Sequence, residues 1–346
     1  MDDPIEHFPA EWEAQDGVLI AWPHPHTDWA ADLPAVESVY VALVAAITRF
    51  ERCLLCVTDA TLQQHATTLL VRAGVNPTKL TWIEIEYDDT WLRDTGPITL
   101  VGGRPGFRLL DFLFTGWGGK FPAERDDALV RGLLQRGLFQ NVVSTRLDFA
   151  LEGGAIDTDG AGTVLSTWQC LRHRHPGCRR VHIEQVLCKA LSVQRILWLE
   201  HGALQGDDTD AHIDTLARFA PNNGIVFQSC DDAGDSHFLE LKAMHQELQA
   251  LRNTDGLAYR LHALPWPPAI IEQGRRLAAS YANYLLVNGG VLVPAYEVST
   301  DTVAAEVIAR AHPDRTMVSV PCRPLIRQNG SLHCVTMQLP RGILTV

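Results

Sequence analysis

One cysteine of the chain, Cys334, lies in a setting that suits a catalytic nucleophile. It follows the turn signal Gly330-Ser331 and is surrounded in sequence by hydroxyl and amide side chains. A cysteine attacks as its thiolate, so a reactive one needs a partly accessible site with a positive charge or a base beside it. Four of the other cysteines occur in apolar periodic runs and are interpreted as buried, unreactive thiols: Cys53, Cys56, Cys188 and Cys230. Three more stay ambiguous: Cys170, Cys178 and Cys322.

A base for this thiol is predicted in the acidic run 207–214. In an extended chain, residues two apart share a face, so His212 and Asp214 would point the same way while Ile213 faces the core. This geometry suits a base with a supporting carboxylate. His333 directly precedes Cys334, but adjacent side chains on a strand face opposite sides, so His212 is the better candidate.

Three acids, an arginine and a tryptophan crowd into residues 88–97. A solvated acidic loop with one ion pair would explain this composition. The alternative is a cation site. A guanidinium group is planar and charged at every biological pH, so its burial requires a facing carboxylate and favours an aromatic face. Asp94 and Trp91 could supply these two features.

Paired glycines follow an acid in Leu151-Glu152-Gly153-Gly154, directly after an apolar, strand-like segment. They are explained by a turn or bulge. Alternatively, they let the backbone approach a ligand closely and leave Glu152 pointing toward it.

A metal site is not predicted. The acidic, histidine-containing run 207–214 could bind a divalent cation, but its spacing matches neither a zinc-protease motif nor a calcium loop. The histidines that could be added to it are interpreted as surface or loop residues: His24, His26, His173 and His175.

The elements that must position these residues follow a repeated pattern, in which an amphipathic helix, a short turn and a β-rich run succeed one another. Two further helices are predicted over 35–49 and 301–312, the latter with Asp301 as N-cap. No linker or low-complexity tract divides the chain, so residues 1–346 are predicted to form a single α/β domain. The five helix-to-strand units are 69–85, 133–149, 186–199, 248–264 and 307–320.

Charge and composition limit which classes of binding partner and which cellular location are expected. The 41 acidic residues against 29 basic ones give a net charge of −12, which argues against nucleic-acid binding. The N-terminal residues do not resemble a secretory signal, and the longest apolar stretch there, 39–47, is too short to span a membrane. Eight cysteines are too few for a disulfide scaffold, so a reducing, cytoplasmic location is expected.

Taken together, these segments resemble the agmatine deiminase family, a branch of the guanidino-group-modifying superfamily related to bacterial peptidyl-arginine deiminases. The resemblance spans nearly the whole chain. It rests on several motifs in the correct order, which are Pro9-Ala10-Glu11-Trp12-Glu13, Ala21-Trp22-Pro23, residues 91–97, residues 151–154, His212-Ile213-Asp214, Ser280-Tyr281-Ala282-Asn283-Tyr284 and His333-Cys334-Val335-Thr336.

The resemblance implies a fold and a set of roles. The family fold is the pentein, an α/β propeller with five αβ units around a pseudo-fivefold axis and the active site in the central channel. Cys334 would be the nucleophile and His212 the general acid/base. Asp94 and Asp214 would hold the guanidinium. Glu152 would orient and charge His212, and Trp91 would pack on the substrate. No cofactor or metal is implied.

The implied reaction is hydrolysis of agmatine to N-carbamoylputrescine and ammonia through a covalent thiouronium on the cysteine, a step of putrescine biosynthesis. Alternatives are deimination of arginine or peptidyl-arginine, amidino transfer, and a non-catalytic pentein that binds a partner. The group attached to the guanidinium stays open, and so does the assembly, with a homodimer as one option. Some positions depart from the family pattern: Ala211 and Ser331 replace glycines, and Asp207-Asp208 replaces Asp-Glu.

Overall fold

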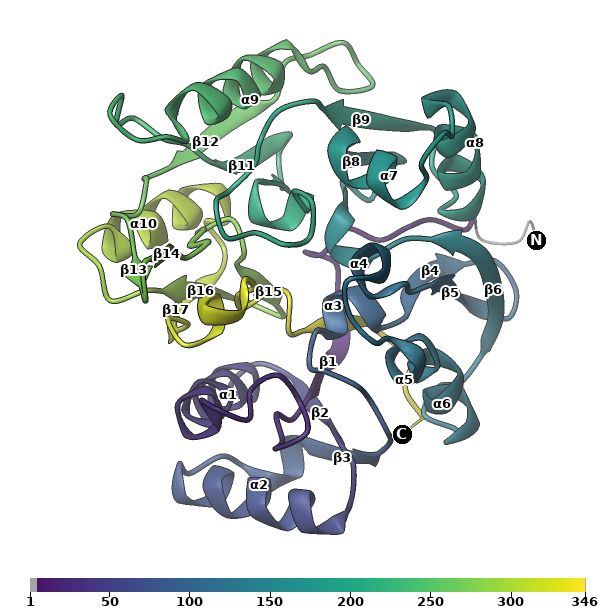
Figure 1. Cartoon of the computed structure of the whole chain (residues 1–346). Helices are drawn as coiled ribbons and strands as arrows, with labels where there is room; N and C mark the ends of the chain where they lie inside the picture. The colour runs from purple at the N-terminus through teal and green to yellow at the C-terminus, as the bar shows by residue number, and fades with distance from the viewer. Residues whose placement is uncertain (1–4, 346) are drawn as a thin grey trace.

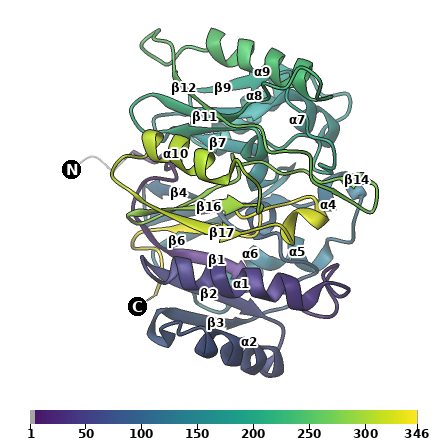
Figure 2. The same ribbon diagram turned by 90° about the vertical axis from the view of Figure 1, so that its left-hand side faces the viewer.

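In the computed structural model, which describes residues 5–345, most strands belong to five sheets of three or four strands. Figure 1 shows these sheets around a common centre, with most of the longer helices on the outside. Helices α2 (Ala60–Arg72) and α9 (Phe238–Ala250) lie at opposite ends of the molecule in both views (Figures 1 and 2). The architecture is therefore α/β, as predicted.

Each of four sheets is built in the same way. An antiparallel hairpin is followed by one or more helices, and the chain then returns as a strand parallel to the second hairpin strand. This parallel return needs a helical crossover, which explains the helix-to-strand repeat in the sequence. The strands of these sheets are β4 (Ile98–Gly102), β5 (Gly106–Leu113) and β6 (Val142–Ala150); β7 (Ile156–Thr158), β8 (Thr163–Thr167) and β9 (Arg195–Leu199); β10 (Ala217–Ala220), β11 (Gly224–Gln228) and β12 (Arg260–Leu264); β15 (Leu285–Val287), β16 (Gly290–Ala295) and β17 (Thr316–Pro321).

The fifth sheet joins the two ends of the described chain. Its order is β18-β1-β2-β3, and β18 pairs antiparallel with β1, so that Leu19 faces Met337. A separate two-stranded hairpin lies between β12 and β15 in the sequence. The strands concerned are β1 (Gln15–Ala21), β2 (Arg52–Val57), β3 (Leu80–Glu84) and β18 (Met337–Pro340), with β13 (Ile271–Glu272) and β14 (Arg275–Arg276) in the hairpin.

The predicted helix-to-strand units are all confirmed, each containing the end of a helix and a parallel strand. The helix predicted over 35–49 is α1 (Leu33–Ile47). The remaining helices are α3 (Leu92–Thr95), α4 (Gly116–Gly119), α5 (Glu124–Asp127), α6 (Leu129–Gln135), α7 (Trp168–Arg174), α8 (Arg180–Ala190) and α10 (Asp301–Ala311), with short 3₁₀ turns η1 (Pro77–Lys79), η2 (Gly153–Ala155), η3 (Ile213–Thr215) and η4 (Leu325–Gln328).

One predicted helix cap is wrong. Asp301 is the first residue of α10, and Thr300 occupies the N-cap position. The Asp301 carboxylate instead accepts backbone N–H groups of the preceding turn, from Tyr296, Glu297 and Val298 at 2.9–3.2 Å. The aspartate thus satisfies donors of the turn that leads into the helix.

The core lies between the sheets and their helices. Val36, Tyr40, Leu43 and Ile47 form the buried face of α1, at the spacing expected of an amphipathic helix. Among the described residues, no helix has the length and apolar character needed to cross a membrane.

The eight cysteines are all unpaired. Cys53, Cys56 and Cys230 are buried, as predicted for thiols in apolar runs, whereas Cys188 is only half-buried. Of the ambiguous ones, Cys170 and Cys322 are buried and Cys178 is exposed.

Candidate active site

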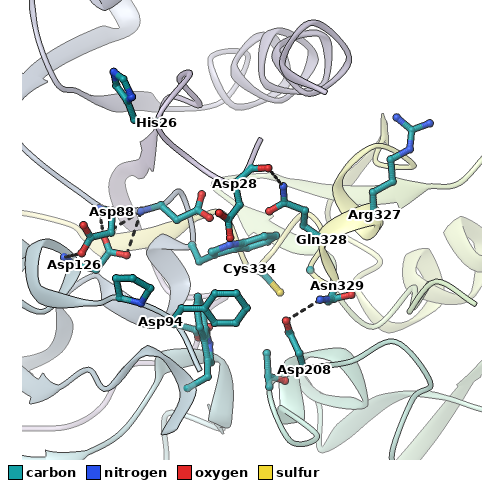
Figure 3. Close-up of a pocket in the computed structure, with 17 residues that line it drawn as sticks. His26, Asp28, Asp88, Asp94, Asp126, Asp208, Arg327, Gln328, Asn329 and Cys334 are labelled. Atoms are coloured by element: carbon teal, nitrogen blue, oxygen red, sulfur yellow. Dashed lines mark hydrogen bonds between the residues drawn. The ribbon is translucent and has the colours of Figure 1, made fainter. Parts of the chain in front are cut away.

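A cavity of about 480 Å³ opens to the Cys334 side chain. Its walls come from segments that follow β1, β3, β5, β9 and β17, all at the carboxyl ends of these strands. Open α/β sheets bind their ligands at this end. Figure 3 shows Cys334 near the centre of the lining residues, with Asp94 and Asp208 beside it.

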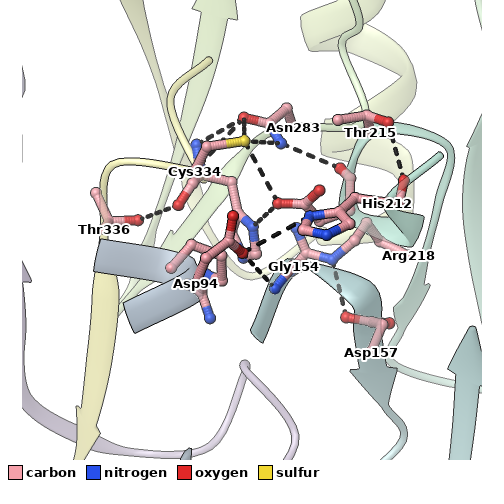
Figure 4. Close-up of polar contacts among 12 residues, drawn as sticks. Asp94, Gly154, Asp157, His212, Thr215, Arg218, Asn283, Cys334 and Thr336 are labelled. Atoms are coloured by element: carbon pink, nitrogen blue, oxygen red, sulfur yellow. Dashed lines mark hydrogen bonds and ion pairs between the residues drawn. The ribbon is translucent and has the colours of Figure 1, made fainter. Parts of the chain in front are cut away.

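Asn283 holds the nucleophile in place. Its Nδ2 donates to Cys334 Sγ at 3.2 Å and to the backbone oxygen of Asp214 at 3.3 Å, while its Oδ1 accepts the backbone N–H of His333 at 2.9 Å. Figure 4 shows this amide against the sulfur. Asn283 belongs to one of the family motifs, but no role was predicted for it from the sequence. The only sequence signal was its position between two tyrosines.

The Cys334 thiol faces two carboxylates. Its Sγ lies 3.6 Å from Asp214 Oδ2. Burial, and then the charges of Asp214 and Asp94, raise the pKa of Cys334 well above the ordinary thiol value. Without a cation beside it the group is therefore a thiol, and an arriving cation would favour its thiolate.

We expect alkylation to report this raised pKa. With iodoacetamide, the rate at Cys334 should stay low near neutral pH and still be rising above pH ~9, because only the thiolate reacts. Peptide mapping by mass spectrometry measures each cysteine separately, and the exposed Cys178 serves as internal control. A plateau for Cys334 below pH ~7 would contradict the prediction.

His212 and Asp214 converge on the site, although the reason given from sequence is wrong. Residues 213–215 form the 3₁₀ turn η3 and not an extended strand. Both side chains are buried. The His212 ring faces one carboxylate on each side, with Nδ1 3.6 Å from Asp94 Oδ1 and Nε2 3.8 Å from Glu152 Oε2.

The charge state of His212 follows from these partners. Burial alone would lower the pKa of its imidazole, but Asp94, Cys170 and Glu152 outweigh that effect and raise the pKa well above its ordinary value. His212 is therefore a proton donor at neutral pH.

Asp94 and Asp214 present carboxylate oxygens to the same space. Asp94 Oδ1 accepts the Gly154 N–H at 2.9 Å, and Oδ2 accepts the Trp117 indole N–H at 2.9 Å. Burial raises the pKa of Asp94 to about 6, with His212 opposing and Asp214 adding to the shift. The Asp214 Oδ1 atom is buried without a hydrogen-bond partner. This arrangement calls for a cation.

His333 is a residue that sequence reasoning set aside. Residues 332–335 form a turn, so the argument from strand faces does not apply. The His333 ring lies between two carboxylates, with Nδ1 2.8 Å from Asp214 Oδ2 and Nε2 2.6 Å from Glu11 Oε1. Burial would raise the pKa of Asp214, but the contact with His333 lowers it, which keeps this carboxylate ionised.

Trp91 lines the cavity, and its packing on the substrate stays a prediction. Its ring lies 5.4 Å from that of Trp29, and a Cβ atom on Gly330 would come within 2.1 Å of it. A second tryptophan of the lining, Trp117, was not predicted. Its backbone is left-handed, with φ of 56°, in a loop whose neighbouring glycines gave the only sequence signal.

The pair Gly153-Gly154 lies in a turn, and Gly154 also brings the backbone close to side chains of the site, while its approach to a ligand stays a prediction. A Cβ atom on Gly154 would lie 2.6 Å from His212 Nδ1, 2.8 Å from Asp94 Oδ1 and 3.3 Å from Asp214 Oδ2. Only glycine therefore leaves room between these three groups.

Gly154→Ala should lower kcat/KM by about 100-fold, because the methyl group would displace the groups that hold the substrate. The backbone φ of Gly154 is not left-handed, so alanine is compatible with the local fold. Steady-state kinetics measures kcat/KM, and circular dichroism checks that the fold is retained. Gly234→Ala, at an exposed turn, is the matched control and should change neither. Full activity of Gly154→Ala would exclude the close-approach role.

Ala211, one of the departures from the family pattern, is also left-handed, with φ of 71°. Its N–H donates to Asp207 Oδ2 at 2.7 Å, which helps fix this conformation directly before His212. The glycine expected at this position would adopt it without strain.

Ala211→Gly should therefore raise the free energy of unfolding by about 0.5–1 kcal/mol, the relief of the left-handed alanine less the greater unfolded-state entropy of glycine. Denaturant titration measures the change. In Ala250→Gly, at the end of α9, the same substitution should destabilise. Equal destabilisation by both substitutions would contradict this account.

The histidines considered as metal ligands are dispersed. His26 lines the cavity, His173 lies 3.2 Å from Asp210, and His175 contacts the Ala150 carbonyl. In the part of the chain that the structure describes, one group has ligand types within 4.8 Å of one another, namely Glu152, Cys170 and His212. It coincides with the partners of His212, and a metal-free site stays a prediction.

Comparison with known proteins extends over nearly the whole chain. Residues 7–340 match the model of the Porphyromonas-type peptidyl-arginine deiminases. The agmatine deiminase of Stutzerimonas stutzeri (strain A1501) is 32% identical over 96% of this chain and 95% of its own length. A structure from Porphyromonas gingivalis, provisionally described as an arginine deiminase, is 43% identical with a TM-score of 0.91, covering 98% of this chain and 100% of that one. A substrate-bound cysteine-to-serine variant of C. jejuni agmatine deiminase is 32% identical with a TM-score of 0.89, covering 98% and 97%.

Proposed function

The chain belongs to the family of Porphyromonas-type peptidyl-arginine deiminases, and from this premise we propose that it is an agmatine deiminase. As such it is a hydrolase of linear amidines that converts agmatine and water to N-carbamoylputrescine and ammonia, which supplies putrescine biosynthesis. Relatives named agmatine deiminase match this chain over nearly their full length, which supports agmatine as the substrate.

One observation carries the proposal. The buried carboxylates of Asp94 and Asp214 approach the Cys334 thiol together, and the Asp214 Oδ1 atom has no partner. A guanidinium offers planar N–H groups to two such carboxylates and brings its electrophilic carbon to the sulfur. Its charge offsets theirs, which would make its burial favourable.

The reaction follows from this geometry. Guanidinium binding favours the Cys334 thiolate, so the thiol proton is released to solvent and the sulfur attacks the guanidinium carbon. The protonated His212 then gives its proton to a departing nitrogen, which leaves as ammonia, and a covalent thiouronium remains. His212, now neutral, takes a proton from water, and the resulting hydroxide attacks the thiouronium carbon. The C–S bond then breaks, the hydroxyl proton of the adduct passes to the Cys334 sulfur, and the ureido product leaves. In this scheme Glu152 orients and charges His212, and Trp91 packs on the substrate.

The rest of the cavity suits a cationic tail. Six aspartates line it, and the arginine of the lining, Arg327, pairs with Asp32 and Glu272. Burial raises the pKa of Asp89 to about 7, with the charge of Asp28 contributing. The ammonium group of agmatine would stabilise the ionised form of these aspartates, whereas these carboxylates would repel the carboxylate of free arginine.

We further propose how the five sheets are arranged, where in the cell the protein is located and how it assembles. The five sheets with their helices would be the five αβ units of a pentein propeller around a pseudo-fivefold axis, with the active site in the central channel and residues 1–346 as one catalytic domain. Unpaired cysteines support a cytoplasmic location. A homodimer stays a prediction, which sedimentation can test.

The experiment is a comparison of substrates. Agmatine, arginine and a blocked arginine peptide are incubated with the protein, and the ureido product is assayed. Agmatine should have the highest kcat/KM. Arginine deimination is the second candidate, favoured by the 43% identity to the P. gingivalis structure. A higher kcat/KM for arginine would overturn agmatine as the substrate. The absence of product from all three substrates would overturn the deiminase function.

A further inference from the structure

Asp210 lies two residues before His212 and has no role in the reaction described above. Its Oδ2 accepts hydrogen bonds from Arg174 Nη1 at 2.6 Å and from Lys120 Nζ at 2.8 Å. We propose that Asp210 is a positioning residue, which fixes the two carboxylate partners of His212 from opposite sides. The proposal rests on the assignment of His212 as the general acid/base.

The first connection runs through Arg174, whose guanidinium is buried and donates one hydrogen bond from each nitrogen. Its Nε donates to Glu152 Oε1 at 2.6 Å, and its Nη2 donates to the Thr209 carbonyl at 2.9 Å. The other oxygen of Glu152 faces His212 Nε2 at 3.8 Å. Asp210 therefore holds the arginine that holds the carboxylate beside the imidazole.

The second connection runs through the loop that contains α4. Lys120 reaches from this loop to Asp210 and to the Asp208 carbonyl. Three residues earlier, the Trp117 indole donates to Asp94 Oδ2, and Asp94 Oδ1 faces His212 Nδ1. The lysine thus anchors the loop that carries the donor to the second carboxylate.

These contacts close a ring around His212. Starting from the imidazole, the ring passes through Glu152, Arg174 and Asp210, then through the 117–120 loop to Asp94 and back. Residues 116–119 and 210–211 all have left-handed backbones. Left-handed residues other than glycine are strained and persist only where the surroundings fix them, so Trp117, Asp210 and Ala211 depend on tertiary contacts of this kind.

The charge of Asp210 suits this role. Burial would raise the pKa of its carboxyl, but Lys120, Arg174 and His173 lower it to about 2. The group stays ionised wherever the protein is folded and active. Without this charge, Arg174 would neutralise Glu152 more fully, and Glu152 would then stabilise the protonated imidazole less. The titratable and charged groups that face His212 from the packed elements are Asp94 on α3, Glu152 before η2, Cys170 and Arg174 on α7 and Asp214 on η3.

The test is Asp210→Asn in the full chain. We expect kcat on agmatine to fall about tenfold. Because His212 must be protonated and its pKa falls, the alkaline limb of the pH profile of kcat should move to lower pH, by about half a unit to one unit. Asp210→Glu, which restores the charge, should restore the limb.

Two further variants separate the connections. Lys120→Met releases the Trp117 loop while leaving Arg174 paired, so KM should rise about threefold with the limb unchanged. Because both substitutions act on the one contact between Lys120 and Asp210, the double variant Asp210→Asn/Lys120→Met should have no higher KM than Lys120→Met alone. Asp207→Asn is the matched control: it lies in the same loop and accepts backbone N–H groups of Thr209 and Ala211, so it should affect stability and not the limb.

A readout without turnover keeps this test separate from the test of the substrate. The His212 imidazole is titrated by NMR in the free protein, with its signal identified by loss in His212→Gln. A lower pKa in Asp210→Asn supports the proposal even if agmatine is not the substrate. An unchanged His212 titration in Asp210→Asn, or the same shift in Asp207→Asn, overturns it. Absence of wild-type turnover on agmatine concerns the proposed function alone.

Discussion

Cys334→Ala should abolish deimination, with kcat reduced by at least about 10⁴-fold, as is typical when a catalytic nucleophile is removed. The reason is covalent: without the sulfur at 3.6 Å from Asp214 Oδ2, no group remains at this place to attack a guanidinium carbon. Mass spectrometry of the wild-type protein quenched during turnover should show an adduct on the peptide that contains Cys334. The variant should show none.

The controls are the other thiols. Cys178→Ala removes an exposed thiol and Cys230→Ala removes one in a different core cluster, so both should retain turnover. Substrate should still bind to Cys334→Ala, because the two carboxylates are unchanged. Turnover by Cys334→Ala would mean that another group is the nucleophile.

His212→Gln should lower kcat by about 10³-fold, within the range for loss of a general acid/base. Glutamine cannot supply the proton for the departing nitrogen, nor take one from water. KM should change much less, because Asp94 and Asp214 remain. The pH profile provides the sharper measurement. Since the raised pKa keeps His212 protonated at neutral pH, wild-type activity should fall as the pH rises through that pKa, and this limb should vanish in the variant.

Another imidazole serves as control for this substitution. His201 is exposed and pairs with Glu247, and neither residue lines the cavity, so His201→Gln should keep both rate and pH profile. If the alkaline limb persisted in His212→Gln, the acid would have to be sought among the other groups of the site.

Sequence patterns predicted the repeated elements well because these depend on local periodicity. Each of the five helix-to-strand units has its apolar spacing and its turn within about twenty residues, and all five are present. The site residues were reached through motifs, and the structure brings Cys334, His212, Asp94, Asp214 and Glu152 together. Their catalytic roles stay predictions until the substitutions are made.

What could not be predicted depends on contacts between distant parts of the chain. The reason for setting His333 aside assumed a strand, whereas the chain turns there. Trp117 lies 23 residues from Asp94, and Arg174 lies 22 residues from Glu152 and 36 from Asp210. Nothing in the local sequence of these residues shows which carboxylate each will meet. Likewise, Asp301 resembled a cap, but the turn before it offered more donors.

The pairing of β18 with β1 has a consequence for the order in which the protein matures. Cys334 lies three residues before β18, and β18 completes a sheet whose other three strands precede residue 85. A growing chain can therefore assemble most of its carboxylate-lined pocket long before the thiol emerges from the ribosome. Cys334 would take its place in the site only when β18 pairs with β1 and completes the sheet. A chain that has not reached this stage would lack a thiol positioned for attack.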